Sequence, residues 1–322
     1  MKQHILIITT IKATAVLAAT AILASICTTA CNSGGEAEGV SFGVVADIQY
    51  DRQAPDKKTR RYTLGVQKIG EAVQTFKGVK NLAFMEDLGD MTDRNCTHYE
   101  DIAAVKKTLG KPCYNIFGNH DFRPSALEEE FKEAAALKGL QTPYYAVREG
   151  GVRFIFLNTS DVATHSAPKG SAEYNFARQW LDSLKAADNP CAKDYNGAVG
   201  REQLTWLEEE LAAADLEGEP VIVNCHMLLM PLVGKESLWN SAEVVAILEA
   251  HPCVKAVFCG HRHDGGYDFV NGIHYVNFLG MVEGETNRYA VVTVKPAKGG
   301  FAAGGKITID GYGDEPDREL EF

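Results

Sequence analysis

Two histidines separated by one residue, His261 and His263, stand directly after an apolar run that ends at Cys259. Such a run predicts a buried strand, and the loop after a strand is where side chains with chemical roles are commonly placed. The two imidazoles are suited to binding a metal ion or to transferring protons. A single pair of this kind consists of ordinary surface or core histidines about as often as of functional ones. Its role therefore depends on the residues that other segments contribute.

Four other segments place polar side chains after predicted strands. Together with the histidine pair they offer seven potential metal ligands: Asp47, Gln49, Asp90, Asn119, His226, His261 and His263. Oxygen ligands mixed with imidazoles suit manganese, iron or zinc, and the glutamine amide favours a hard ion such as Mn²⁺. Seven ligands are too many for one tetrahedral ion, so the set predicts two divalent ions that share a bridging carboxylate.

Predicted helices alternate with these segments along the first half of the chain. Strands are expected at 40–46, 81–85 and 114–117, and helices at 61–76 and about 99–109. This alternation predicts an α/β fold with a largely parallel core, in which sites gather at the carboxyl ends of the strands. The polar segments lie at such ends.

The second half of the chain carries the remaining elements of the same domain. The runs at 144–147 and 153–157 predict a second sheet or a hairpin, and a strand at 221–225 leads to His226. Helices are expected at 172–186, 203–214 and 242–250, and short strands at 267–270, 274–278, 290–294 and 306–309. Since the sequence shows no internal repeat and no second helical core, we expect one domain over 40–322.

In their order along the chain, the five polar segments resemble the motifs of the calcineurin-like metallophosphoesterases. The resemblance implies a four-layer αββα sandwich, in which two packed sheets are flanked by helices. It also implies one ion bound by Asp47, Gln49, Asp90 and His263, and a second bound by Asp90, Asn119, His226 and His261. His120 would then protonate the leaving oxygen or stabilise charge without binding metal, and Asp93 would orient it.

Within that family, the chain is most similar to the manganese-dependent ADP-ribose/CDP-alcohol diphosphatases. The general family has histidine where Gln49 stands. Other segments share the resemblance: Arg60-Arg61-Tyr62, Asn196-Gly197, Gln203-Leu204-Thr205-Trp206-Leu207, and the run from His263 to Tyr267. The loop at 53–58 departs from the family, which has a longer loop with an aromatic residue there.

This resemblance implies a hydrolase that cleaves the pyrophosphate bond of ADP-ribose, CDP-choline or CDP-glycerol with a metal-bridging hydroxide. Two ions would neutralise the diphosphate and activate the water, so that no serine or cysteine nucleophile is required. One alternative keeps the metals and acts on phosphomonoesters, cyclic nucleotides or other phosphodiesters, because one centre can serve them all. A non-catalytic envelope binding protein is disfavoured, because loss of activity normally deletes ligands and the full set is present.

Four further residues are candidates for contact with the substrate. The guanidinium groups of Arg60, Arg61 and Arg94 could bind phosphate oxygens in pairs, and Tyr267 could stack on a base. The remaining histidines fall outside the ligand pattern, and we interpret them as ordinary surface or core residues: His98, His165, His251 and His274.

Charge and the N-terminal segment bear on partners and location. A net charge of −11 argues against a nucleic-acid partner, which requires a basic face. Residues 1–30 resemble a bacterial lipoprotein signal, with Cys31 as the acylated residue and 31–39 as a flexible linker. We therefore expect a lipid-anchored protein of the bacterial cell envelope. The six cysteines beyond residue 39 show no paired spacing, and we expect no particular disulfide.

Overall fold

The computed structural model describes residues 39–93, 95–122, 136, 138–140, 142–229 and 234–322. By its internal contacts the chain divides into residues 1–35 and 36–322, and the described residues belong to the second unit. The expected signal segment, Cys31 and Arg94 lie outside the described residues, so the lipid anchor stays a prediction. No helix in the described part of the chain is both long and apolar enough to span a bilayer.

The first sheet has six strands in the order β12-β11-β10-β1-β2-β3. Its parallel half consists of β1 (Val40–Val45), β2 (Leu82–Asp87) and β3 (Cys113–Asn115). The antiparallel half comes from the end of the chain, as β10 (Arg288–Ala297), β11 (Gly300–Gly313) and β12 (Arg318–Glu321). The sheet therefore joins the two ends of the domain.

The second sheet also has six strands, in the order β4-β5-β6-β7-β9-β8. Four of them are parallel: β5 (Val152–Phe156), β6 (Val221–Cys225), β7 (Val254–Cys259) and β9 (Ile273–Leu279). Hairpins add the two edge strands, β4 (Tyr145–Glu149) and β8 (Asp264–Val270). The runs at 144–147 and 153–157 thus form a hairpin that is part of a second sheet.

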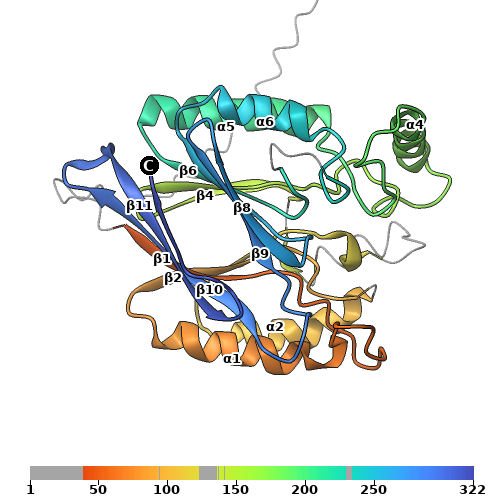
Figure 1. Cartoon of the computed structure of the whole chain (residues 1–322), viewed down its shortest axis with the longest axis horizontal. Coiled ribbons are helices and arrows are strands. Elements are labelled where there is room, and N and C mark those ends of the chain that lie inside the picture. Colours follow the sequence, from red (N-terminus) through yellow and green to blue (C-terminus); the bar gives the residue numbers. More distant parts are fainter. Residues whose placement is uncertain (1–38, 94, 123–135, 137, 141, 230–233) are drawn as a thin grey trace, which may run out of the picture. The chain divides into compact units, whose positions relative to one another are not determined.

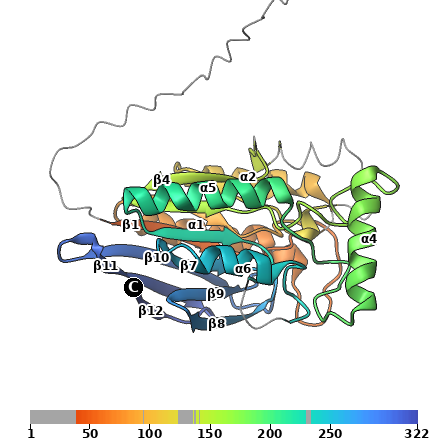
Figure 2. The ribbon, with the colours of Figure 1, turned by 90° about the horizontal axis from the view of Figure 1, so that it is seen from above.

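Helices cover the outer face of each sheet, as Figure 1 shows. Helices α1 (Gly65–Gly78) and α2 (Tyr99–Lys107) lie against the first sheet, and α5 (Arg201–Glu217) and α6 (Ser241–Glu249) against the second. Helix α4 (Ala172–Ala186) stands apart from them in both views (Figures 1 and 2). The four-layer αββα prediction is confirmed. The expectation of a largely parallel core was wrong in part, because the final strands pair antiparallel.

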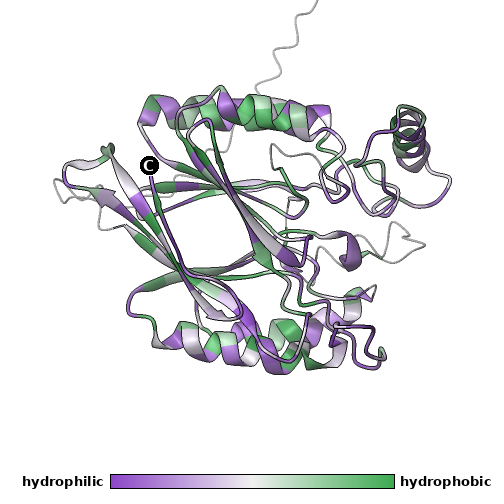
Figure 3. Ribbon diagram, in the orientation of Figure 1, coloured by the Kyte–Doolittle hydropathy of each residue, from purple (hydrophilic) through white to green (hydrophobic). Residues whose placement is uncertain are grey.

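The core between the two sheets consists mainly of aromatic and branched side chains, and the strands there are largely hydrophobic in Figure 3. Phe42 of β1 stacks on Phe84 of β2 at 4.7 Å between ring centroids, and both rings meet the edge of Phe154 of β5 at 5.1 Å. Burying each such ring contributes about 1.5–3 kcal/mol. This packing fixes the first sheet against the second, which the site requires because its residues come from both.

Candidate metal centre

The loops that follow four parallel strands bring polar side chains from both sheets to one place. Asp47 follows β1 and Asp90 follows β2, while His226 follows β6 and His261 follows β7. Three of these residues, Asp47, Asp90 and His261, have left-handed backbone with φ of 52°, 55° and 69°, and Gln49 has φ of 45°. Such conformations cost about 1–3 kcal/mol each in a residue with a side chain, and they cluster at functional sites. This backbone strain indicates that the loops after the strands are shaped to hold these side chains at the site.

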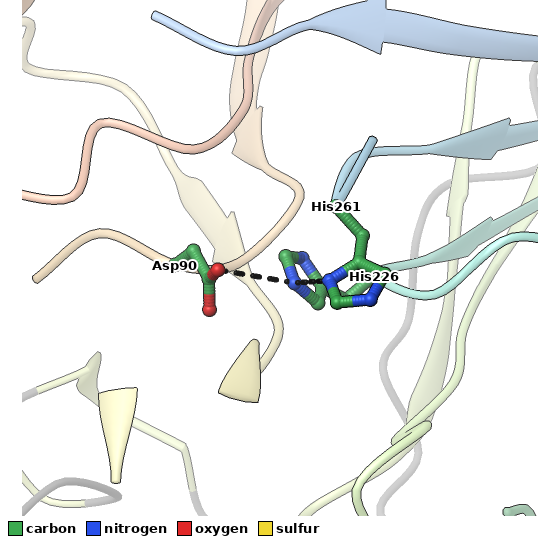
Figure 4. Close-up of side chains that lie close together, drawn as sticks. All are labelled: Asp90, His226 and His261. Atoms are coloured by element: carbon green, nitrogen blue, oxygen red, sulfur yellow. Dashed lines mark hydrogen bonds and ion pairs between the residues drawn. The ribbon is translucent and has the colours of Figure 1, made fainter. Parts of the chain in front are cut away.

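One group of ligand atoms joins Asp90 to two histidines, as Figure 4 shows. Oδ2 of Asp90 lies 3.3 Å from Nε2 of His226, which in turn lies 3.2 Å from Nδ1 of His261. One ligand atom from each of the three residues lies within 4.8 Å of the others. Oδ1 of Asn119 lies 3.3 Å from the same Nε2 of His226. Four of the seven predicted ligands therefore meet here.

A second group joins Asp90 to the other predicted ligands. Nε2 of Gln49 lies 3.1 Å from Oδ2 of Asp90 and 3.2 Å from Nε2 of His263. That imidazole nitrogen lies 3.4 Å from Oδ1 of Asp47. Asp90 therefore lies between the two groups, which is the position that a bridging carboxylate needs.

Backbone and side-chain acceptors orient the three imidazoles. Nδ1 of His226 donates to the carbonyl of Leu88 at 2.7 Å, which turns Nε2 toward Asp90. Nδ1 of His263 lies 2.7 Å from Oε1 of Glu283, and Nε2 of His261 lies 3.0 Å from Oδ1 of Asn196. Groups that hold the outer nitrogen of a metal-binding histidine fix its orientation. Asn196 belongs to the Asn196-Gly197 segment that shares the family resemblance, but it was not expected to contact a ligand, and no local pattern marks Glu283.

Asp121 holds the loop that carries Asp90. Its carboxylate accepts hydrogen bonds from the backbone N–H groups of Asp90, Met91 and Gly118, at 3.0, 3.0 and 2.9 Å. Lys138 is buried against it, with Nζ 2.7 Å from Oδ2 of Asp121. A Cβ at Gly118 would collide with the Asp90 carboxylate, so the loop can approach only because that position is glycine.

The electrostatics of the cluster are dominated by close carboxylates and imidazoles. Burial acts to raise the pKa of Asp90, but the histidines around it hold that pKa well below its usual value. Burial acts to lower the pKa values of His226 and His263. Asp90 nevertheless raises the pKa of His226 to about 9, and Asp47 and Glu283 raise the pKa of His263 to about 9. Burial and the neighbouring His226 lower the pKa of His261 well below normal.

The residues fit a pair of divalent cations. Oδ1 of Asp47 is buried and accepts no hydrogen bond, and in the cluster it faces Nε2 of His263 at 3.4 Å, so a carboxylate oxygen is directed at the place where a cation would bind. Such an oxygen costs about 1–3 kcal/mol unless something binds it. Carboxylate and amide oxygens beside imidazoles match manganese, iron or zinc. The donor set of the site thus suits the metals that the sequence predicts.

A cavity of about 700 Å³ opens over the cluster. His120 and Arg60 line it with five of the predicted ligands. Nδ1 of His120 lies 2.5 Å from Oδ1 of Asp93, so its other ring nitrogen is left for the cavity. A guanidinium nitrogen of Arg60 donates to Oε1 of Gln49 at 3.2 Å, and its Nε donates to Glu283 at 3.3 Å. Arg60 can therefore contact a molecule bound in the cavity, while it also forms hydrogen bonds with Gln49 and Glu283.

Other predicted contacts lie away from the cavity, and one unpredicted residue lines it. Arg61 forms an ion pair with Asp56 at 3.6 Å, and the hydroxyl of Tyr267 lies 3.0 Å from Nδ1 of His274 on the surface of β8 and β9. Neither is among the residues that line the cavity. His165, interpreted from the sequence as an ordinary surface or core residue, is among them. It reaches the cavity because the long segment after β5 folds back over the strand ends.

Comparison with known proteins agrees with this geometry. The model of the calcineurin-like phosphoesterase family matches residues 40–265. A two-sheet α/β fold with polar loops gathered at its strand ends is the architecture of a phosphoesterase, and the chain belongs to the calcineurin-like phosphoesterase family.

Relatives and solved structures resemble the chain over most of its length. Proteins named manganese-dependent ADP-ribose/CDP-alcohol diphosphatase are 28% identical in Oryza sativa, over 80% of this chain and 89% of theirs, and 26% identical in Homo sapiens, over 88% and 92%. The crystal structure of a dimetal phosphatase from Danio rerio has a TM-score of 0.75 and 20% identity, covering 88% of this chain and 99% of that one. This likeness confirms the predicted fold.

Proposed function

We propose that this protein is a metal-dependent hydrolase that cleaves the diphosphate bond of small nucleoside diphosphate compounds such as ADP-ribose, CDP-choline and CDP-glycerol. The observation that carries the proposal is the position of Gln49, whose side-chain amide lies between Asp90 and His263 in the second ligand group. Its Nε2 is 3.1 and 3.2 Å from them, and Oε1, which accepts a hydrogen bond from Arg60, would turn toward them to bind an ion. The resemblance distinguishes these diphosphatases from the general family by glutamine at this position, and relatives with that name align with most of the chain.

The seven clustered residues would bind two divalent ions, with manganese favoured by the oxygen-rich donor set and by the relatives' names. Asp47, Gln49, Asp90 and His263 would bind one ion, and Asp90, Asn119, His226 and His261 the other. Such ions neutralise the charge of a diphosphate and make water a better nucleophile.

Other residues of the chain would donate the proton and supply positive charge. His120 lines the cavity, and its Nδ1 is held by Asp93, so Nε2 is placed to give a proton to the oxygen that leaves the phosphorus. The backbone N–H of His120 donates to Oδ1 of Asp90 at 2.7 Å, which fixes the histidine relative to the central carboxylate. Arg60 supplies a positive charge at the same cavity.

Hydrolysis by the metal-stripped protein, with Mn²⁺ or Mg²⁺ added back, tests this function. We expect Mn²⁺-dependent release of AMP from ADP-ribose and of CMP from CDP-choline, with little hydrolysis of p-nitrophenyl phosphate. The Asp90→Asn variant should lose this activity, since its carboxylate lies between both ligand groups. Exposed Glu208 on α5 offers a matched control, because Glu208→Gln also removes one negative charge. Activity on the aryl phosphate alone would refute the diphosphatase function and leave the phosphoesterase fold in place.

A further inference from the structure

Exposed lysines gather at the end of the first sheet that is opposite to the metal centre. They come from the last turns of α1 and α2, from the turns that follow these helices, and from the β10–β11 hairpin: Lys77, Lys80, Lys107, Lys111, Lys295 and Lys298. Within the described part of the chain, none of the six forms an ion pair with a carboxylate. We call this group of six lysines the basic end.

The strand pairing explains why lysines from distant segments lie at one end. Strand β10 ends beside the start of β1, β1 and β2 start together, and β3 starts on the other side of β2. Because adjacent strands lie about 4.8 Å apart, the lysines next to these strand ends span roughly 15 Å across the sheet. The ends of α1 and α2 also meet, since Nζ of Lys77 donates to Oγ1 of Thr108 at 3.2 Å.

The positive charge of the basic end is not offset by acidic residues in the same segments. Residues 72–85, 102–120 and 288–309 contain no Asp or Glu, although the whole chain has a net charge of −11. Carboxylates of adjoining strands have partners: Lys306 pairs with Glu319 at 2.8 Å and lies opposite Glu321, and Tyr114 donates to Glu149 at 3.1 Å. At the second sheet, two arginines form ion pairs with the carboxylates at the end of α5.

Helix stabilisation accounts for only part of the basic end. Lys77 and Lys107 lie in the last turns of α1 and α2, where a positive charge interacts favourably with the helix dipole. That effect falls off beyond the last turn, so it does not explain Lys80 and Lys111. The two lysines of the hairpin belong to no helix. Four of the six lysines therefore have no such role in the fold.

The tip of the β10–β11 hairpin adds an uncharged surface to the basic end. The hairpin projects past the other described elements in both views (Figures 1 and 2). Residues 299–305 consist of glycine, alanine and Phe301, and Ala302 and Ala303 are exposed. Lysines attract anionic headgroups, and small apolar groups beside them can enter the interface of a bilayer. The combination is therefore suited to a lipid surface.

The first described residue lies at the same end. Gly39 packs so closely against β10 that a Cβ there would collide with the carbonyl oxygen of Val294, next to Lys295. The expected acylated residue, Cys31, is eight residues before Gly39, a stretch that spans at most about 28 Å. A tether that joins the domain here would bring the basic end to the bilayer. The metal centre is roughly 20 Å away, at the other end of β1.

We propose that the basic end binds the surface of a bilayer that contains anionic lipids. Lys80, Lys111 and the two hairpin lysines lie against the phosphate headgroups, and the hairpin tip lies at the interface. The metal centre then opens away from the bilayer, toward solutes in the surrounding water. None of the seven predicted metal ligands belongs to the basic end, so the proposal does not depend on the proposed function.

Sedimentation with vesicles tests the proposal. The chain from residue 31 is used with Cys31→Ser, so that no acyl chain is attached, and it is loaded with manganese. It retains the whole compact unit of residues 36–322. We expect it to bind vesicles of phosphatidylcholine and phosphatidylglycerol, with an affinity that falls as salt is added. Equal binding to vesicles of phosphatidylcholine alone would overturn the proposal.

A pair of matched double variants locates the binding surface. Lys80→Gln with Lys298→Gln should lower the affinity for the anionic vesicles about 25-fold, since each lysine near such a surface contributes about fivefold. Lys57→Gln with Lys169→Gln removes the same charge from exposed lysines outside the basic end and should have little effect. Both double variants should keep the Mn²⁺ affinity and the free energy of unfolding of the parent chain. Equal losses of vesicle affinity in the two, or no loss in the first, would overturn the proposal.

Fluorescence quenching by lipids with brominated acyl chains tests the position of the hairpin. The fluorescence that Ala302→Trp adds should be quenched by anionic vesicles more strongly than that of Phe176→Trp, which replaces an exposed ring on α4. Equal quenching in the two variants would overturn the proposed orientation. Binding to dextran sulfate, a soluble polyanion, without binding to the vesicles would assign the basic end to another acidic partner and overturn the proposal.

Discussion

Oε1 of Glu283 lies 2.7 Å from Nδ1 of His263, although the two residues lie in different loops at one end of the second sheet. The same carboxylate accepts a hydrogen bond from Nε of Arg60 at 3.3 Å. Hydrogen bonding to His263 holds the pKa of Glu283 down to about 2. A permanent negative charge therefore fixes the outer nitrogen of one predicted ligand and leaves Nε2 directed at Asp47 and Gln49.

Removing that charge is expected to weaken metal binding. In Glu283→Gln the amide can still form a hydrogen bond with Nδ1 of His263. Without the negative charge, however, it makes the imidazole a weaker electron donor to a metal ion. Loss of such an outer partner typically lowers metal affinity or activity by about 10–100-fold. Titration of the metal-stripped protein with Mn²⁺ measures the effect, with Glu208→Gln as the matched surface control. Equal affinities in the variant and the control would show that Glu283 has no part in positioning His263.

Asn196 is expected to position His261 in the same way. Its Oδ1 lies 3.0 Å from Nε2 of His261, while its Nδ2 donates to the carbonyls of Cys191 and Lys235 at 2.9 and 2.8 Å. Asn196→Ala should therefore lower the affinity for Mn²⁺ and also the free energy of unfolding, the latter by about 1–3 kcal/mol for the buried groups left unpaired.

A double-variant cycle with His261→Ala separates these two effects. If Asn196 acts on the metal through His261, the losses of affinity should fall well short of additive. The loss of stability through the Cys191 and Lys235 carbonyls should persist in the His261→Ala background. Fully additive losses of metal affinity would contradict a positioning role.

The elements that carry the site could be predicted from the sequence because each has a strong local signal. The apolar run before His226 predicts 221–225, and the structure has β6 at Val221–Cys225. The helical periodicity over 172–186 likewise matches α4. The predicted ligands are found together because parallel strands place the residues that follow them at one edge. Their roles as metal ligands remain a prediction that the titrations above would test.

The supporting residues could not be predicted, since their partners depend on tertiary packing. Glu283 is 20 residues from His263, and Asn196 is 65 from His261, in segments without regular structure. His165 looked ordinary because nothing near it in sequence shows that its loop returns to the cavity. Strand β12 was missed for a related reason. It is short and mostly charged, and it is a strand because it pairs with β11.

Metal binding is expected to release protons at neutral pH. Despite burial, nearby carboxylates raise the pKa values of His226 and His263 to about 9, so both imidazoles are protonated at pH 7 before metal binds. A metal ligand must be neutral imidazole, so uptake of metal should release about two protons at pH 7. The affinity for Mn²⁺ should accordingly rise with pH up to about pH 9.

Calorimetric titration with Mn²⁺ in buffers of different ionisation enthalpy counts these protons. The His263→Gln variant should release about one proton fewer than the unchanged protein, because its side chain does not titrate. Heats that do not depend on the buffer would contradict the raised pKa values.

The buried ion pair of Lys138 and Asp121 should be required for stability. Nζ of Lys138 also donates to the carbonyl of Ile116 at 2.9 Å. Lys138→Met would leave the Asp121 carboxylate buried without its cation, and breaking such a pair costs about 3–5 kcal/mol. Urea unfolding measures the loss, and Lys107→Met on the exposed face of α2 provides the control. A loss no larger than the control's would mean that the four backbone donors around Asp121 suffice.

Glu86 presents the opposite case, a buried carboxyl whose removal should stabilise the protein. It lies on β2 two residues after Phe84, so its side chain points into the same core between the sheets. Neither of its carboxyl oxygens has a hydrogen-bond partner. Burial first, and the neighbouring Asp87 second, raise the pKa of Glu86 well above its ordinary value of 4.5. The side chain is therefore protonated in the folded state at pH values where the unfolded chain has lost the proton.

Because the folded pKa lies above the unfolded one, the free energy of unfolding should fall as the pH rises above 4.5. Glu86→Leu removes both the titration and the unpaired oxygens, so it should stabilise the protein at pH 7 by about 1–3 kcal/mol and flatten its stability between pH 5 and 8. Glu86→Gln should flatten the pH dependence as well, with a smaller gain, since its amide is still buried. Urea unfolding at several pH values measures both effects, with exposed Glu100→Gln on α2 as the control. Destabilisation by Glu86→Leu at pH 7 would show that the carboxyl has a partner between the sheets, such as a bound water.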